Sequence, residues 1–218
     1  MKKRKQILAA VLCILMGALA GCGTAEQKEA YPAMELADIS KMELATAESG
    51  TAKYQYAADI WTTGEEVVNS LILYEKESMN TEKPVRINVQ IAGERKKALD
   101  KAFMEQVLTE LKKNASLTVE TCEMRSFDGN PVIYMENSFS FNEEVLDSML
   151  ENGVWTEEIL EQAGGRETVL QMPDSRSMIV YGIVDGNLTA CGGTYYEDEQ
   201  KQKVADAINV MLQTIEIK

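Results

Sequence analysis

The sequence contains no histidine in its 218 residues. Histidine is the commonest general base and a frequent metal ligand, so its absence excludes a Ser-His-Asp triad and the usual histidine-containing zinc sites. Cysteine is also scarce, because only Cys122 and Cys191 lie beyond the N-terminal segment, too few for an all-cysteine zinc site. The sequence has no Gly-x-Ser-x-Gly elbow and no phosphate-binding glycine loop. It therefore predicts a protein that is not an enzyme and holds no metal or cofactor.

Basic residues are outnumbered by acidic ones. The chain has 22 Lys and Arg against 35 Asp and Glu, and four of the basic residues lie among residues 2–5. Without those four, 18 basic residues face 35 acidic ones, a formal charge of −17. Nucleic-acid binding depends on neutralising phosphates with basic side chains, so this composition excludes nucleic acid as a partner. It indicates a soluble body that an anionic membrane surface repels.

The N-terminal apolar run is too short to cross a bilayer, which takes about 20 residues. Gln6–Ala20 follows a basic start and leads into Leu19-Ala20-Gly21-Cys22, the pattern of a secretory signal. The last four residues resemble the lipobox of bacterial lipoproteins. That resemblance implies cleavage before Cys22 and a diacylglyceryl group on its sulfur. Two acyl chains would hold the protein stably at the extracytoplasmic side of the cell membrane. We expect a signal peptide at 1–21 and a lipidated Cys22.

The rest of the chain divides into a tether and a domain. Residues 22–40 are predicted to be the lipidated cysteine and a flexible tether, because residues 23–30 are small and polar and show no periodic apolar face. Residues 41–218 are enough for a single domain with its own core. A segment at 142–165 interrupts the strand pattern with two helical stretches, around Val145–Leu150 and Trp155–Leu160, and is predicted to be a helical insert.

Alternating apolar residues predict strands, and apolar residues four apart predict helices. Asp-Gly pairs at 128–129 and 185–186 predict tight hairpin turns, and Gly64 is predicted to break the chain. The strand at 85–91 alternates cleanly, so its polar residues are expected to meet solvent or a partner. Expected strands cover 53–61, 70–74, 85–91, 117–126, 132–135, 177–184, 187–196 and 214–217, and expected helices cover 99–111 and 204–212. This order predicts an α+β fold, an antiparallel sheet flanked by helices.

The order of elements resembles the PsbP-like fold, named for a photosystem subunit. Tyr54–Trp61 looks like that family's opening strand, and the helix Leu99–Leu111 leads into the Asp128-Gly129 hairpin. The strand Gly186–Tyr196, the terminal helix and Thr214–Ile217 are similar to its closing pattern. The resemblance covers roughly residues 50–218 except the insert. It implies a non-enzymatic accessory or binding protein and assigns no functional residues.

Together these observations predict a membrane-anchored lipoprotein with a non-catalytic accessory or protein-binding role. Its expected partner is another envelope protein, contacted through the sheet or through the insert. Trp155, Tyr195 and Tyr196 are the candidate contact residues. The alternative function is small-ligand or ion binding, in a pocket beside the small-residue strand Cys191–Tyr195.

Three further features have competing interpretations. Cys122 and Cys191 either form a disulfide, which an extracytoplasmic location allows, or stay free as buried thiols. The acidic pairs at 65–66, 143–144 and 157–158 are attributed to favourable charge at helix N-termini rather than to paired carboxylates of glycosidase type. The acidic run Glu197-Asp198-Glu199 lacks the spacing of a calcium loop, so no calcium site is predicted.

Overall fold

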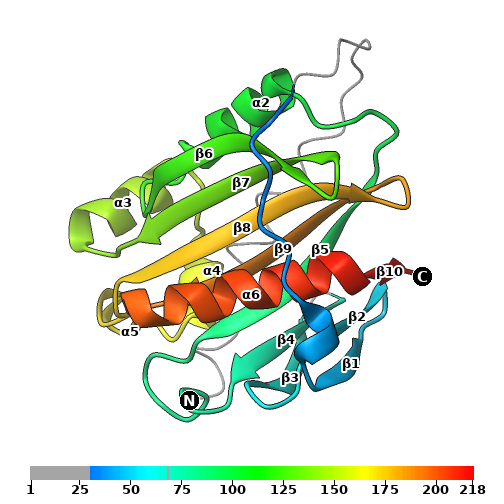
Figure 1. Ribbon diagram of the computed structural model, residues 1–218. Coiled ribbons are helices and arrows are strands. Elements are labelled where there is room, and N and C mark those ends of the chain that lie inside the picture. Colours follow the sequence, from blue (N-terminus) through cyan, green and yellow to red (C-terminus); the bar gives the residue numbers. More distant parts are fainter. Residues whose placement is uncertain (1–29, 68) are drawn as a thin grey trace.

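Two antiparallel sheets organise the part of the chain that the computed structural model describes, residues 30–67 and 69–218 (Figure 1). Within this part, one sheet has the strand order β3-β4-β5-β9-β8-β7-β6 and the other has the order β1-β2-β10. Helices flank the larger sheet, which confirms the predicted α+β fold class. The strands are β1 (Leu44–Glu48), β2 (Ala52–Ala57), β3 (Trp61–Val67), β4 (Ser70–Glu75), β5 (Arg86–Glu94), β6 (Leu117–Phe127), β7 (Asn130–Phe139), β8 (Ser175–Val184), β9 (Asn187–Tyr195) and β10 (Glu216–Ile217).

The predicted signal peptide, Cys22 and the first part of the predicted tether lie outside the described residues. Among the residues that are described, no helix is both long and apolar enough to cross a membrane.

Two Asp-Gly turns close the hairpins β6–β7 and β8–β9, as predicted. Asp128 and Gly129 have φ angles of 47° and 78°, and Asp185 and Gly186 have φ angles of 48° and 75°. Positive φ at both central positions gives a turn whose twist matches that of the two strands. β9 also pairs with β5, so the second hairpin joins the two halves of the large sheet.

The expected strand at 53–61 is two strands that belong to different sheets. β2 ends before the turn at Ala58–Ile60, and β3 begins after it. Gly64, which was expected to break the chain, lies inside β3 at a shift in its register with β4. A Cβ atom at Gly64 would lie 2.4 Å from Cε2 of Tyr74, so glycine lets the tyrosine ring approach the bulged strand closely.

Two polar residues of β5 are buried, contrary to the expectation from the sequence. Arg86 and Gln90 are only 6% and 5% exposed, although the alternating pattern predicted that they meet solvent or a partner. Gln90 is paired with Ala190 of β9, so both side chains lie on the same face of the sheet, and Ala190 belongs to the core that the shorter helices cover. The side chain of Asn88 is satisfied within the sheet, since its Nδ2 donates a 2.9 Å hydrogen bond to Oγ of Ser70 on β4.

One face of the large sheet is covered by the small sheet and by α6 (Asp198–Thr214), which runs along β9 (Figure 1). The apolar stripe of α6 faces the core, because Val204, Ile208 and Met211 are fully buried. Gly193 on β9 brings the helix close: a Cβ atom there would lie 2.6 Å from Cγ1 of Val204. This face therefore depends on close contact between one long helix and one glycine-containing strand.

The opposite face is covered by four shorter helices: α2 (Lys101–Leu111), α3 (Glu143–Glu151), α4 (Glu157–Gln162) and α5 (Arg166–Leu170). The two helices predicted within 142–165 are present as α3 and α4, while α5 extends the insert beyond its predicted end. Each insert helix packs one apolar side into a core around Trp155, through Leu146, Leu160 and Val169 respectively. Their short length is compatible with this role because tertiary packing rather than helix propensity stabilises them.

Residues 32–41, here called the strap, cross from the large sheet to α6. Two backbone hydrogen bonds of 2.8 Å join its beginning to Ser126 on β6. Further along, Ala37 N donates to Oδ1 of Asn209 at 2.9 Å, and Ala37 O accepts from Nε2 of Gln213 at 3.0 Å. The predicted tether therefore does not reach residue 40. The domain begins near residue 32, because these amide side chains bind the strap's backbone groups.

Candidate functional site

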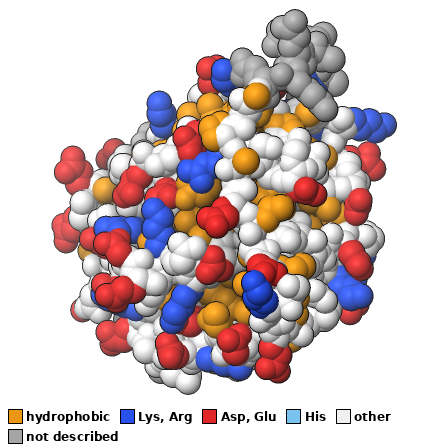
Figure 2. All heavy atoms as spheres, viewed as in Figure 1, with side chains coloured by type: hydrophobic (Ala, Val, Ile, Leu, Met, Phe, Trp, Pro, Cys, Tyr) orange, Lys and Arg blue, Asp and Glu red, His pale blue; other side chains and the backbone are white. Residues whose placement is uncertain are grey.

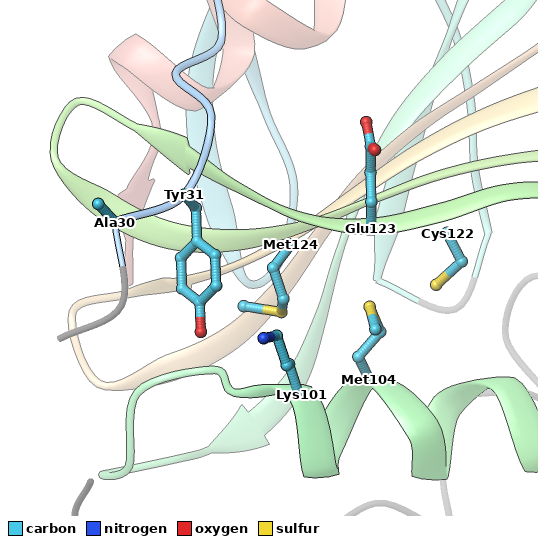
Figure 3. Close-up of a pocket in the computed structure, with 7 residues that line it drawn as sticks. All are labelled: Ala30, Tyr31, Lys101, Met104, Cys122, Glu123 and Met124. Atoms are coloured by element: carbon cyan, nitrogen blue, oxygen red, sulfur yellow. The ribbon is translucent and has the colours of Figure 1, made fainter. Parts of the chain in front are cut away.

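A cavity of about 500 Å³ lies between α2, β6 and the residues that lead into the strap (Figure 3). It is found on the face of the large sheet that the four shorter helices cover. The seven residues that line it are Ala30, Tyr31, Lys101, Met104, Cys122, Glu123 and Met124.

The first turn of α2 fixes one wall of this cavity. Asp100 caps the helix, because its Oδ1 accepts a 2.8 Å hydrogen bond from Phe103 N. Phe103 is buried in the core, so the helix cannot rotate freely. Lys101 and Met104 are three residues apart and therefore lie on the same side of the helix, next to the cavity. The cap and the buried phenylalanine thus position both side chains.

β6 forms the facing wall. Cys122 and Met124 are two residues apart, so they point to the same face of the sheet, toward α2. Figure 3 shows both side chains on the cavity side, whereas the Glu123 side chain points away. Glu123 instead binds Arg125 on the other face, with 2.5 Å between its Oε1 and a guanidinium nitrogen. The cavity wall from β6 therefore consists mainly of two sulfur-containing side chains.

Cys122 is half-buried, and its chemistry follows from that. Burial, with a smaller contribution from the nearby Glu123 carboxylate, raises the pKa of the Cys122 thiol to about 11. At neutral pH the side chain is therefore a neutral thiol, a weak nucleophile rather than a reactive thiolate. The cavity offers sulfur atoms, an amine and a phenol, which suits binding of a small ligand more than attack on a substrate.

The three aromatic candidates from the sequence do not come together. Trp155 and Tyr195 are each 2% exposed and belong to core clusters on opposite faces of the large sheet. Tyr196, just after β9, is half-buried, and its backbone N–H donates a 2.9 Å hydrogen bond to Oε1 of Gln200. Trp155 and Tyr195 therefore have a packing role in this structure. The sequence did not indicate which elements cover them.

Cys122 and Cys191 are both free in this structure. Cys122 packs toward α2, whereas Cys191 packs into the core beneath α6. The strands β7 and β8 separate them, and their side chains point to opposite faces of the sheet. A disulfide requires Cα atoms within about 7 Å, which this arrangement does not provide.

The small residues of β9 were expected to leave room for a ligand. α6 occupies that space on one face, because a Cβ atom at Gly193 would lie 2.6 Å from Val204 and 2.8 Å from Ile87. The absence of a side chain at Gly193 therefore makes room for α6 rather than for a ligand. The cavity beside Cys122 lies elsewhere, and none of its lining residues belongs to the strand Cys191–Tyr195.

The outward side of the insert is strongly acidic. Between residues 142 and 170 the chain has eight acidic residues and one basic residue, Arg166, which binds Asp147 at 2.7 Å. Figure 2 shows acidic side chains along the edge of the molecule where Figure 1 places α3. All eight acidic side chains are exposed: Glu143, Glu144, Asp147, Glu151, Glu157, Glu158, Glu161 and Glu167. We call this set the acidic surface.

Helix stability explains only part of the acidic surface. Acidic residues in the first turns of α3 and α4 are favourable because they lie near the positive end of the helix dipole. Asn142 and Thr156 cap the same two helices by accepting hydrogen bonds from backbone N–H groups. Glu151 and Glu161 lie in the last turns, where negative charge is unfavourable. Their presence is therefore not accounted for by the helices themselves.

A second polar cluster lies on the α6 face of the sheet. The Glu136 carboxylate accepts hydrogen bonds from the Tyr134 hydroxyl and from Nζ of Lys201, the latter at 2.8 Å. Arg125 stacks over the Tyr134 ring, with its guanidinium carbon 3.6 Å from the ring centre. Partial burial acts to raise the pKa of Glu136, but the hydrogen bonds from Lys201 and Tyr134 outweigh it and lower the pKa. The cluster attaches α6 to β7.

The described residues contain no group of three or more His, Cys, Asp or Glu side chains arranged to hold a metal ion. No family model matches the sequence, and no curated protein matches it. The chain is similar to the solved structure of LpqN, involved in cell envelope biogenesis in Mycobacterium tuberculosis, with a TM-score of 0.43 and 12% identity over 82% of this chain and 92% of that one.

Two further solved structures are similar to the chain. The Ran-binding protein Mog1p of Saccharomyces cerevisiae has a TM-score of 0.46 and 9% identity, over 81% of this chain and 96% of that one. The cyanobacterial PsbP of Synechocystis has a TM-score of 0.40 and 10% identity, over 93% of this chain and all of that one. These similarities are too distant to transfer a function, a partner or a site.

Proposed function

We propose that the protein is a membrane-anchored extracytoplasmic lipoprotein with a non-catalytic, protein-binding role, and that its partner presents a basic surface to the insert. The acidic surface supports this proposal most directly. Its side chains are exposed, one basic residue accompanies eight acidic ones, and helix stability leaves Glu151 and Glu161 unexplained. Complementary charge across an interface favours the correct partner and speeds its association.

The anchor is supported by the N-terminal sequence. A basic start, a short apolar run and Leu-Ala-Gly-Cys precede the domain in the order that a lipoprotein signal requires. Mass spectrometry of the detergent-extracted protein should show an N-terminal Cys22 that carries a diacylglyceryl group. Cys22→Ala should abolish the added mass and release the domain from membranes. An unmodified Cys22 in the wild type would reject the anchor.

The partner can be tested by charge reversal on the insert. Affinity capture from solubilised membranes should recover a partner with the wild type, and raised salt should weaken this recovery. The triple variant Glu151→Lys, Glu158→Lys and Glu161→Lys should lose the partner.

A matched control makes the same change of net charge elsewhere. Asp59, Glu82 and Glu105 are exposed and lie outside the insert, so their reversal to Lys should leave capture intact. Equal loss in both triple variants would point to net charge alone and contradict a docking role of the acidic surface. Recovery of the bait alone from wild-type membranes would reject protein binding.

A second candidate function is small-ligand binding in the cavity beside Cys122. Its volume of about 500 Å³ falls within the range of ligand pockets, and its walls combine apolar and polar groups. A thermal-shift screen with small molecules should then reveal a stabilising ligand, because a ligand that binds only the folded state raises its stability.

A further inference from the structure

Three sulfur atoms border the cavity between α2 and β6. They belong to Met104 on α2 and to Cys122 and Met124 on β6. Figure 3 shows the sulfurs of Met104 and Cys122 on the cavity side, with Met124 beside them. Methionine often fills irregular gaps in cores, but here a cavity remains open between the three residues. Met104 and Cys122 are half-buried.

We propose that Met104, Cys122 and Met124 form a binding site for a monovalent soft cation, Cu(I). Thiolate and thioether sulfur are the protein ligands that select Cu(I), whereas Mg²⁺ and Ca²⁺ require oxygen ligands. A structural zinc ion takes four ligands, typically cysteine and histidine, and the chain has no histidine. A set of one thiol and two thioethers thus fits Cu(I) better than a divalent ion.

The backbone places the three sulfur-containing side chains around one cavity. Cys122 and Met124 are two residues apart on one face of a strand, which separates their Cα atoms by roughly 7 Å. Met104 approaches from the facing helix, and each methionine has three rotatable bonds with which its sulfur can adjust. The Asp100 cap and the buried Phe103 hold α2 in place, so the site requires only side-chain movement.

Charge also favours a monovalent ion. On binding, the Cys122 thiol transfers its proton to solvent, and Cu⁺ with the resulting thiolate forms a neutral unit. No net charge is then added beside the Lys101 ammonium, which lines the same cavity. A divalent ion bound to the same ligands would leave a net positive charge next to that lysine.

This inference deepens the second candidate function by naming its ligand and its residues, and it does not depend on the acidic surface. The experiment uses the mature full chain in detergent, without oxygen, titrated into the coloured Cu(I)–bicinchoninate complex. One equivalent of Cu(I) should transfer to the wild type. Cys122→Ser should abolish transfer, and Met104→Leu and Met124→Leu should each weaken affinity by about tenfold or more.

The controls separate this site from the other sulfur atoms in the chain. Cys191→Ala removes the buried thiol under α6, and Met42→Leu removes a methionine near the end of the strap, so both variants should bind like the wild type. Leu has nearly the volume of Met, so the Leu variants should keep the fold, which circular dichroism would verify. X-ray absorption of the loaded wild type should show sulfur-only coordination.

Several results would overturn the proposal. These are no transfer to the wild type, unchanged transfer to Cys122→Ser, or wild-type affinity in both Met→Leu variants, which would indicate binding by a thiol alone. None of these results would affect capture through the insert, so failure of this site and failure of protein binding are distinguishable.

Discussion

On one face of the large sheet a single helix of 17 residues, α6, packs directly against β9, whereas on the other face four helices of 5 to 11 residues share the cover. On the α6 face, Gly193 allows the helix to pack closely against β9. On the other face the cover consists of short helices, and both the cavity and the acidic surface lie there. Both faces therefore contribute to the core, one through close contact with a single long helix and the other through short helices packed around the buried Trp155.

The largest expected change in stability is that of Trp155→Ala, on the face of the large sheet that the four shorter helices cover. Trp155 is 2% exposed and central to the core under the insert, so truncation should lower the free energy of unfolding by about 3–5 kcal/mol. Urea denaturation measures this loss. Leu36→Ala is the matched control: Leu36 is 46% exposed, and its truncation should have little effect. A small effect at Trp155 would mean that the insert does not share the main core.

On the α6 face the corresponding test is Gly193→Ala. The new Cβ would lie under 3.0 Å from side chains on α6 and β5, so overpacking should destabilise the fold by about 1–3 kcal/mol. Gly182→Ala on the neighbouring strand β8 is the control, because its Cβ would meet only Val132 at an ordinary 3.7 Å. Equal midpoints of thermal unfolding for the two variants would show that α6 is not seated as closely as described.

A pH series sharpens the role of Glu136 in attaching α6. Its pKa is lowered from 4.5 in the folded state, so its stabilising contribution is present above that value and is lost as pH falls through the folded pKa. Glu136→Gln should therefore cost about 1–3 kcal/mol at pH 7 and much less toward about pH 2. Glu123→Gln, which alters an exposed ion pair, should cost at most about 1 kcal/mol. A loss at Glu136 that does not vary with pH would refute the ionic contribution.

The smallest expected difference concerns the reactivity of the two thiols. Burial raises the pKa of Cys122 to about 11 and that of Cys191 to about 12. Native alkylation of Cys122 should be slow at neutral pH and accelerate about tenfold per pH unit until the thiol ionises, while Cys191 should stay protected. After unfolding without reductant, mass spectrometry should find both thiols modified. Two unmodified cysteines would indicate the disulfide instead.

Local sequence patterns predicted the hairpins, α6 and most of the strands. These elements rest on short-range chemistry, such as the positive φ angles of two Asp-Gly turns. The strap escaped prediction because it has no apolar period and depends on Asn209, which lies 172 residues from its partner Ala37. Likewise, Gly64 looked like a chain break because only the tertiary structure places the Tyr74 ring against it.

The candidate site was less predictable than the fold. Trp155, Tyr195 and Tyr196 were the candidate contacts, yet Trp155 and Tyr195 are core residues because the sheet is covered on both faces. Cys122 and Met124 share a face because they are two residues apart on β6. Nothing local indicated that Met104 would lie opposite them, because that contact joins a helix to a strand across a loop.

The strap also has a mechanical consequence. Its hydrogen bonds to Ser126 and to the amides of Asn209 and Gln213 link the beginning of the domain to its last helix. Tension applied at the N-terminal end, as an anchor would apply it, passes sideways into β6 and α6 before it reaches β1. The first strand is thereby spared from being peeled off one hydrogen bond at a time.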